Sequence, residues 1–329
     1  MTSSTTRASP PAGWPAPRAV YIHVPFCRHR CGYCNFSVVA GRDELATRYL
    51  DAIDRELSPL GRPPIETVYI GGGTPTNLSH GQLRRLLNCI GDRFDLAEAV
   101  EWTVEANPED IDDCVLAILR DAGVNRISLG VQSFDDRKLT ALERGHTGDK
   151  AAAVIQQVAA QIPNLSIDLI FGCPAESRRI WQSDLNTALA LPISHLSTYS
   201  LTFEKGTSFW NRRRRGQLTP VTESLEVEMY DLARRKTAAS GMQHYEVSSF
   251  ARSGMRCRHN VVYWEGRGWF AAGPGAARFV AGRREVNHRS TTTYLKRIES
   301  GVCPTAETEV ISAEEHARER AAFGIRMID

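Results

Sequence analysis

An apolar segment followed by an amphipathic one occurs six times in succession, and this alternation limits the folds open to the chain. The apolar segments are short and rich in β-branched residues, as buried strands are, whereas the segments between them carry hydrophobic residues at helical spacing. Such alternation calls for a parallel sheet with helices outside it. The expected strands span residues 19–25, 67–70, 101–106, 126–130, 165–171 and 195–201.

The amphipathic segments predict the helices that connect these strands. Right-handed crossovers would wrap six such units either into a partly closed barrel or into a doubly wound sheet. The loops that follow the strands are rich in glycine and polar residues, and in barrels chemistry is built on that face. The expected helices span residues 43–60, a segment capped by Ser79, and residues 111–122, 150–161, 180–191 and 222–241.

The pattern changes after residue 241. We expect an edge strand at 243–247, short strands at 261–264 and 277–280, and a helix that starts near Ser312 and still continues where the sequence stops. An end inside a helix suggests a truncated or absent C-terminal helical region. The predicted organisation is a disordered tail at 1–18, the α/β unit at 19–241, a small β-containing extension at 242–311, and the start of a helical region at 312–329.

Composition narrows the class of protein. The chain has 329 residues, of which 42% are hydrophobic and 24% charged, so it can bury a large core. The net charge of +2 gives no sign of a nucleic-acid partner. A basic run, Arg212–Arg215, is interpreted as a solvated loop or helix end rather than as an anion or membrane patch. No apolar run reaches the roughly 18 residues of a membrane span, and no secretory signal is visible.

Three of the eight cysteines form a compact group directly after the first strand. Cys27, Cys31 and Cys34 are separated by gaps of three and two residues, whereas the other five are scattered. This distribution suits a metal site in a reducing, cytoplasmic compartment better than a disulfide framework. Three thiolates can hold three irons of a [4Fe-4S] cube and leave the fourth open. The alternative is a zinc knuckle completed by His23 or His29.

Two other features lie at or within the expected strands. The run Gly71-Gly72-Gly73-Thr74-Pro75 follows a strand, where glycines permit positive φ and close approach of the backbone to a ligand, or simply a tight turn. Asp168 interrupts an otherwise apolar strand. A buried lone carboxylate is costly without a partner, so Asp168 is expected to face the interior and a ligand.

The cysteine group, written CxxxCxYC, resembles the signature of the radical S-adenosylmethionine enzymes. The resemblance implies a partial (β/α)6 barrel of the TIM type with a small C-terminal extension. It implies that Cys27, Cys31 and Cys34 hold a [4Fe-4S] cluster, whose open iron chelates S-adenosylmethionine. One electron from the cluster, which an electron donor would supply, then breaks the sulfonium and gives a 5′-deoxyadenosyl radical.

The same resemblance implies a set of residues for S-adenosylmethionine. The glycine run is similar to the family's GGGTP loop, which contacts the amino and carboxylate groups. Arg144 would pair with the carboxylate, because arginine offers a bidentate fork. The full set is Tyr21, Tyr33, Gly72, Gly73, Thr74, Glu105, Gln132, Arg144 and Asp168.

Within the family, the sequence resembles the haem-biosynthesis branch, and two features separate its members. Phe36 stands where oxygen-independent coproporphyrinogen III dehydrogenases carry a further cysteine, and the stretch before the first strand is short. Residues 258–264 are similar to the HNxxYW motif of the HemW-type haem chaperones, which implies haem binding by His259, Tyr263 and Trp264. Cys257 is an alternative haem ligand.

The resemblance therefore implies a haem chaperone that binds a [4Fe-4S] cluster, S-adenosylmethionine and haem. Its expected partners are haem-accepting proteins such as respiratory enzymes at the membrane, and a homodimer is a further expectation. No catalytic residue is assigned. The alternatives are a coproporphyrinogen III dehydrogenase and a zinc-stabilised α/β binding protein. Three residues depart from the family pattern, namely Cys173, Ser249 and Ala277.

Overall fold

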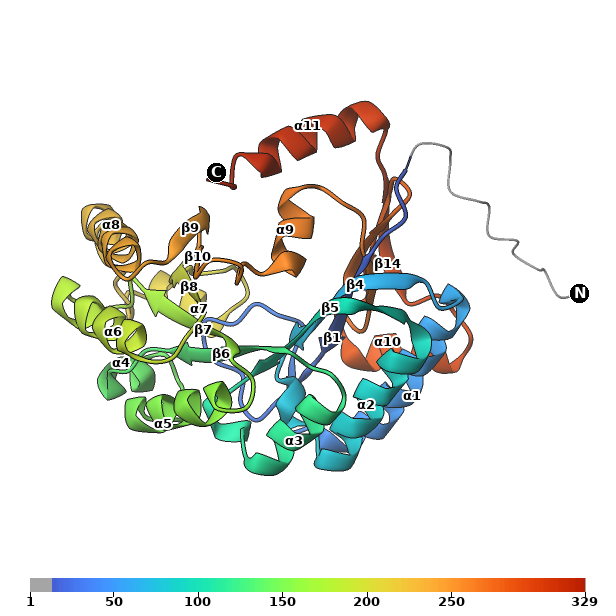
Figure 1. Ribbon diagram of the computed structural model, residues 1–329, viewed down its shortest axis with the longest axis horizontal. Helices are drawn as coiled ribbons and strands as arrows, with labels where there is room; N and C mark the ends of the chain where they lie inside the picture. The colour runs from blue at the N-terminus through green and yellow to red at the C-terminus, as the bar shows by residue number, and fades with distance from the viewer. Residues whose placement is uncertain (1–13, 329) are drawn as a thin grey trace, which may run out of the picture.

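A curved, nine-stranded sheet organises the computed structural model, which describes residues 14–328 (Figure 1). Most of the predicted disordered tail thus lies outside the described residues. The strand order is β11-β1-β4-β5-β6-β7-β8-β10-β9. The six central strands are parallel, and they agree with the six predicted from the sequence. They are β1 (Ala19–Val24), β4 (Pro64–Gly72), β5 (Asp95–Ala106), β6 (Arg126–Gln132), β7 (Asn164–Phe171) and β8 (His195–Ser200).

Three short strands complete the sheet at its edges. β11 (Phe270–Ala272) runs parallel to β1, whereas β10 (Ser249–Ala251) is antiparallel to β8 and carries β9 (Gln243–Glu246) outside it. Within residues 14–328, the outermost strands β11 and β9 do not pair with each other. The sheet is therefore a partial barrel, which confirms the expected fold class.

The crossover helices cover the outer side of the sheet (Figure 1). Each turns an apolar stripe toward the strands, as α1 does with Tyr49, Ile53 and Leu57. Ser79 caps α2 and forms a reciprocal capping box with Gln82. The helices are α1 (Ala46–Leu57), α2 (His80–Arg93), α3 (Asp113–Asp121), α4 (Asp136–Ala141), α5 (Gly148–Ala159), α6 (Arg178–Ala190), α7 (Ser208–Arg214) and α8 (Glu223–Ala239).

The segment 242–311 is only in part a separate extension, because β9, β10 and β11 belong to the main sheet. The rest forms a three-stranded antiparallel sheet of β12 (Ala277–Val280), β13 (Arg283–Asn287) and β14 (Thr305–Val310), with α10 (Thr291–Glu299) against α1. The predicted edge strand near 243 and the strand at 277–280 are confirmed.

The predicted strand at 261–264 is wrong, because this segment lies in α9 (Arg258–Trp264). Its β-branched and aromatic residues favour a strand, but tertiary contacts override that preference. The carboxylate of Glu101, on β5, accepts hydrogen bonds from the backbone N–H groups of Arg258 and His259, both at 3.0 Å. It thereby satisfies donors that the first turn of a helix leaves free.

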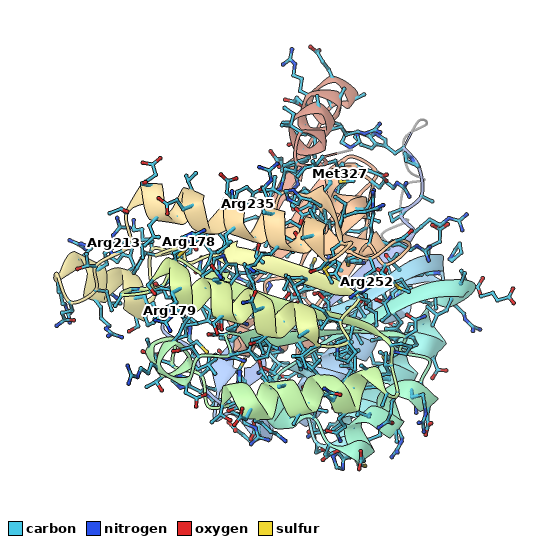
Figure 2. The ribbon with its side chains drawn as sticks, turned by 60° about the vertical axis from the view of Figure 1, so that its left-hand side comes forward. Arg178, Arg179, Arg213, Arg235, Arg252 and Met327 are labelled. Atoms are coloured by element: carbon cyan, nitrogen blue, oxygen red, sulfur yellow. The ribbon has the colours of Figure 1, made fainter. Side chains whose placement is uncertain are left out.

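The last helix, α11 (Ala313–Gly324), begins after Ser312 as predicted, but the expectation that the sequence stops inside it is wrong. The segment after the helix returns to the main sheet, where Met327 forms a β-bridge with Glu246 (Figure 2). In Figure 1, α11 lies above α9, at the open side of the barrel. In the described part of the chain, no helix is both long enough and apolar enough to cross a membrane.

The basic run Arg212–Arg215 ends α7 and is largely exposed, so it is the solvated helix end that the sequence predicts. Figure 2 shows Arg213 on this outer face together with Arg178 and Arg179 of α6. Three of the run's side chains lie over aromatic rings, at 5.3, 5.1 and 4.8 Å: Arg212 over Phe209, Arg213 over Phe203 and Arg214 over Trp210.

Two short strands, β2 (Phe26–Cys27) and β3 (Val39–Ala40), pair in parallel beyond the end of β1 and frame the cysteine loop.

Candidate functional site

The three clustered cysteines lie on one loop at the carboxyl end of β1, and each is partly buried. The loop turns tightly, with the N–H of Cys34 bonded to the carbonyl of Cys31 at 3.0 Å. Helix α7 supports it from outside, because the N–H of Phe209 donates to the carbonyl of Gly32 at 2.8 Å. A Cβ atom at Gly32 would lie 2.4 Å from the ring of Phe209, so this contact requires glycine.

The thiols face polar groups from two other segments. Sγ of Cys27 lies 3.5 Å from the hydroxyl of Thr74, and Sγ of Cys31 lies 3.7 Å from a guanidinium nitrogen of Arg144. Burial raises the pKa of Cys27 to about 11. Because metal ligands must be thiolates, loading this loop with iron would release protons.

The geometry does not favour the zinc knuckle. Within residues 14–328, no three His, Cys, Asp or Glu side chains converge on a point where one ion would sit. His23 bonds instead to Tyr21 at 3.0 Å and to the carbonyl of Ser37 at 2.9 Å, and His29 faces Glu143 at 3.5 Å. Both histidines of the zinc alternative thus have other partners, whereas a cube would need only the three thiolates.

The glycine run lies beside the cysteines, at the carboxyl end of β4. Gly72 has φ +107°, and a Cβ atom there would lie 2.4 Å from the ring of His23. A Cβ atom at Gly71 would lie 2.6 Å from the carboxylate of Glu105. The N–H groups of Gly73 and Thr74 bond to carbonyls of the first strand and the cysteine loop. Glycine is therefore required at positions 71 and 72, because side chains of neighbouring strands approach the backbone closely there. No side chain of these glycines covers the backbone near the thiols.

Glu105 is held at the inner side of the same run by two donors. The hydroxyl of Tyr69 donates to Oε1 at 2.8 Å, and the N–H of Gly72 donates to Oε2 at 2.9 Å. Burial raises the pKa of this carboxyl, and the two hydrogen bonds oppose the rise in part. Glu105 is thus an oriented acceptor that can meet an ammonium or hydroxyl group.

Arg144 connects the cysteine loop with β6. One guanidinium nitrogen donates to the carbonyl of Gly130 at 2.9 Å and to Asn107, and the other approaches Cys31. Nε is buried and has no hydrogen-bond partner among the described residues. A buried donor without a partner is costly, and a carboxylate ligand would satisfy it. Asn107 also donates to the hydroxyl of Thr74, at 2.8 Å.

Gln132 and Asp168 complete the polar interior. Gln132 has φ +65°, an uncommon value for a residue other than glycine, at a bulge that ends β6. Asp168 on β7 lies 3.4 Å from the hydroxyl of Ser128. Burial and the nearby carboxylate of Glu105 raise the pKa of Asp168 to about 7. The structure thus brings the predicted S-adenosylmethionine residues to one end of the barrel interior.

Tyr21 and Tyr33 lie on either side of this polar group. The ring centroid of Tyr21 is 6.2 Å from that of Tyr69, and the ring of Tyr33 packs edge-on against Phe209 at 6.0 Å. Tyr33 packs against a small apolar cluster that is distinct from the main core.

The predicted haem residues lie deeper in the barrel, and they do not face one common space. His259 is 1% exposed; its Nδ1 is 2.9 Å from the hydroxyl of Thr67 and its Nε2 is 2.8 Å from the hydroxyl of Tyr263. Burial lowers the pKa of His259 to about 3, so the ring is neutral. Cys257 is also buried, with Sγ 3.8 Å from Glu101.

Tyr263 and Trp264 instead line an aromatic pocket of about 310 Å³ between α9, α11 and the small sheet. Neither His259 nor Cys257 lines it. The other lining residues are Gly266, Trp269, Phe279, Arg284, His316, Glu319 and Phe323.

Several residues of these sites were not predicted from the sequence, and three of them show why. Tyr69 shares the inner face of β4 with Thr67, a relation that strand alternation could have indicated. Asn107 directly follows the strand that carries Glu105, so its position at the strand end was a usable signal. His316 comes from a distant helix, and no local pattern points to it.

The superfamily profile described as "Radical SAM superfamily" matches residues 21–187. The haem chaperone HemW of Bacillus subtilis is 36% identical over 316 residues, which cover 94% of this chain and 83% of the relative. HemW of Mycobacterium tuberculosis strain H37Rv is 36% identical over 319 residues, covering 94% of this chain and 82% of the relative.

Among solved structures, coproporphyrinogen III oxidase (HemN) from Escherichia coli superposes with a TM-score of 0.83 over 94% of this chain and 76% of that one. Its sequence is 22% identical, so the match supports the fold alone. The profile match and the identity to the curated relatives show that the chain belongs to the radical SAM superfamily and, within it, to the family of the haem chaperone HemW.

Proposed function

We propose that this protein is a haem chaperone that binds haem at the aromatic pocket beneath α11 and releases it to haem-requiring proteins. The proposal rests on one observation above all: Tyr263 and Trp264, the aromatic residues of the HNxxYW segment, line a common pocket with Trp269 and Phe279. A wall of aromatic rings suits a flat, apolar macrocycle. The names of the curated relatives support the same cargo.

A [4Fe-4S] cluster and S-adenosylmethionine belong to the proposed function as resident groups. Cys27, Cys31 and Cys34 would hold the cluster, which supplies one-electron reduction of S-adenosylmethionine when both are bound. Glu105 would accept from the ligand's ammonium or ribose, and Arg144 would donate to its carboxylate. These roles fit the oriented carboxylate and the unpartnered Nε described above.

The acceptors that we propose are respiratory haem proteins at the membrane, reached from the cytoplasm. We also propose that an electron donor reduces the cluster and that the protein forms a homodimer.

The experiment is a haem titration of the anaerobically reconstituted protein, followed by mixing with an apo-haemoprotein such as apomyoglobin. We expect a saturable Soret band and transfer of haem to the acceptor. Absence of saturable binding would contradict the proposal.

Coproporphyrinogen III dehydrogenase is the second candidate, and the oriented polar group around Glu105, which would serve radical chemistry on S-adenosylmethionine, favours it. Phe36, which is 63% exposed beside the cysteine loop, occupies the position of that enzyme's further cysteine. We therefore expect no protoporphyrinogen from coproporphyrinogen III under reducing conditions with S-adenosylmethionine. Steady product formation would favour the dehydrogenase.

A further inference from the structure

His259 is poorly placed to bind a metal in this fold. Both of its ring nitrogens are within hydrogen-bond distance of hydroxyl groups, from Thr67 and Tyr263, and its ring lies against Tyr69 with centroids 5.2 Å apart. Coordination of iron would require the ring to give up at least one of these bonds and to leave a fully buried position. A buried hydroxyl left without its partner adds to the cost.

His316, on α11, has a different environment. Its Nε2 lies 2.7 Å from the carbonyl oxygen of Gly266. A carbonyl only accepts, so Nε2 carries the hydrogen of the neutral ring and Nδ1 keeps a free lone pair. Among residues 14–328, no hydrogen-bond partner of Nδ1 is found, and the ring lines the aromatic pocket. Histidines that bind metals usually donate their other ring N–H in this way, to a carbonyl or carboxylate.

Two aromatic rings, which also contact each other, pack against this imidazole. The ring centroid of His316 is 4.7 Å from that of Trp14 and 5.2 Å from that of Phe279. Phe279 continues to Trp269 at 5.8 Å, and Trp269 to Tyr263 at 4.7 Å. The pocket therefore offers one nitrogen donor within an aromatic wall, which is the combination that an iron porphyrin needs.

Three guanidinium groups lie in or next to the pocket, one on β13, one on α11 and one in the segment after α11. Arg326 lies over Trp264 at 4.4 Å, and Arg320 donates to the carbonyl of Glu265 at 3.0 Å. Arg284 lines the pocket and bonds to Glu319 at 2.7 Å. Guanidinium groups at the edge of an apolar pocket complement the propionates of haem.

Helix α11 contributes no buried residue to the core. Polar contacts such as the Arg284–Glu319 ion pair hold it. The present volume of about 310 Å³ is at the lower end for small-molecule sites, which span about 300–1,000 Å³. A complete porphyrin would therefore need more room beneath α11 than this pocket provides.

We propose that His316 is the iron ligand of haem bound beneath α11, while His259 stays bonded to Thr67 and Tyr263 within the barrel. This inference rests on the proposed haem-binding function and names the ligating residue of that site.

The test compares His316→Ala with His259→Gln in the reconstituted full chain, with His80→Ala, an exposed histidine on α2, as the control. Ferric haem and metal-free protoporphyrin IX are the two probes. We expect His316→Ala to weaken haem binding at least about tenfold, to shift the Soret band, and to recover the band on addition of imidazole. Protoporphyrin affinity should stay within about twofold, because that probe has no iron to ligate.

Three outcomes would overturn the proposal. A Soret band that is unchanged in His316→Ala but lost in His259→Gln would assign the iron to His259. If His316→Ala weakened the binding of ferric haem and of protoporphyrin IX equally, His316 would be part of the pocket wall and not the iron ligand. Failure of the unmodified protein to bind haem would reject the proposed function itself, whereas the first two outcomes reject only the ligand. Misfolding of His316→Ala and His259→Gln is excluded if their thermal unfolding temperature and cluster content equal those of His80→Ala.

Discussion

The two ends of the barrel interior differ in how their functional residues are held. At the cysteine end, the thiols, the glycine run and Glu105 lie on loops and strand ends that follow one another along the sheet. At the α9 end, the pocket joins helices and strands from distant parts of the chain, and its cover, α11, has no buried residue. The first end is built from local segments, and the second from distant segments beneath an exposed helix. We infer that the first end is rigid and that the second can open. The comparison suggests a fixed cofactor site and an adaptable cargo site.

The largest effect should come from removing one cysteine of the group. Cys31→Ser should abolish the cluster, because a serine hydroxyl is a much poorer iron ligand than a thiolate. Iron and sulfide analysis after anaerobic reconstitution measures this. Cys303→Ser, at an exposed position outside the group, is the matched control and should retain full iron content. Equal iron content in both variants would contradict the assignment of the cluster to the cysteine end.

Gly72→Ala should have the next largest effect. The new Cβ would lie 2.4 Å from the ring of His23, at a φ of +107° that side chains rarely adopt. We expect S-adenosylmethionine affinity to fall at least about tenfold, or about 1.4 kcal/mol, by isothermal titration. Gly81→Ala, on α2 with open space around it, should leave affinity unchanged. Wild-type affinity in Gly72→Ala would show that this end is less rigid than proposed.

The raised pKa of Asp168 predicts a pH dependence of stability. Its folded pKa of about 7 exceeds the usual unfolded value of about 3.9, so the folded state binds the extra proton. The contribution is fully present below pH of about 4 and is lost as the pH rises through about 7. Asp168→Asn should remove this component, on the order of 2 kcal/mol after allowance for partial solvent access. Denaturant unfolding from pH 4 to pH 8 measures it, and parallel curves for both proteins would contradict the assignment.

Tyr69 lies between the two ends, so Tyr69→Phe tests whether they are independent. Its hydroxyl donates to Glu105 at 2.8 Å, whereas its ring packs against His259. We expect a loss of about 1 kcal/mol in S-adenosylmethionine binding, because Glu105 loses one donor, and no change in the haem spectrum. Tyr69→Leu, which also removes the ring, is the companion variant. A shifted Soret band in Tyr69→Phe would show that the hydroxyl couples the ends.

The sequence predicted the cysteine end far better than the α9 end, and the reason is physical. Cys27, Gly72 and Glu105 follow strands, and the carboxyl ends of parallel strands meet at one edge of a sheet. The position of a strand in the chain therefore almost determines where these side chains lie. The six central strands followed from hydrophobic alternation for the same reason.

The α9 end depends on contacts that no local pattern contains. Residues 261–264 have the composition of a strand, but Glu101 caps them as a helix and turns His259 toward Thr67. His316 reaches the pocket only because α11 crosses over α9. The motif thus identified the aromatic residues of the pocket, whereas the direction of each imidazole required the fold.

The most direct test of the central claim, two separate sites in one chain, is a haem titration of the combined variant Cys27→Ala, Cys31→Ala, Cys34→Ala. This variant cannot hold the cluster, but the pocket beneath α11 is unchanged. We predict haem affinity within about twofold of the unmodified protein and the same Soret position. Loss of haem binding in this variant would contradict the account, because it would place haem at the cysteines.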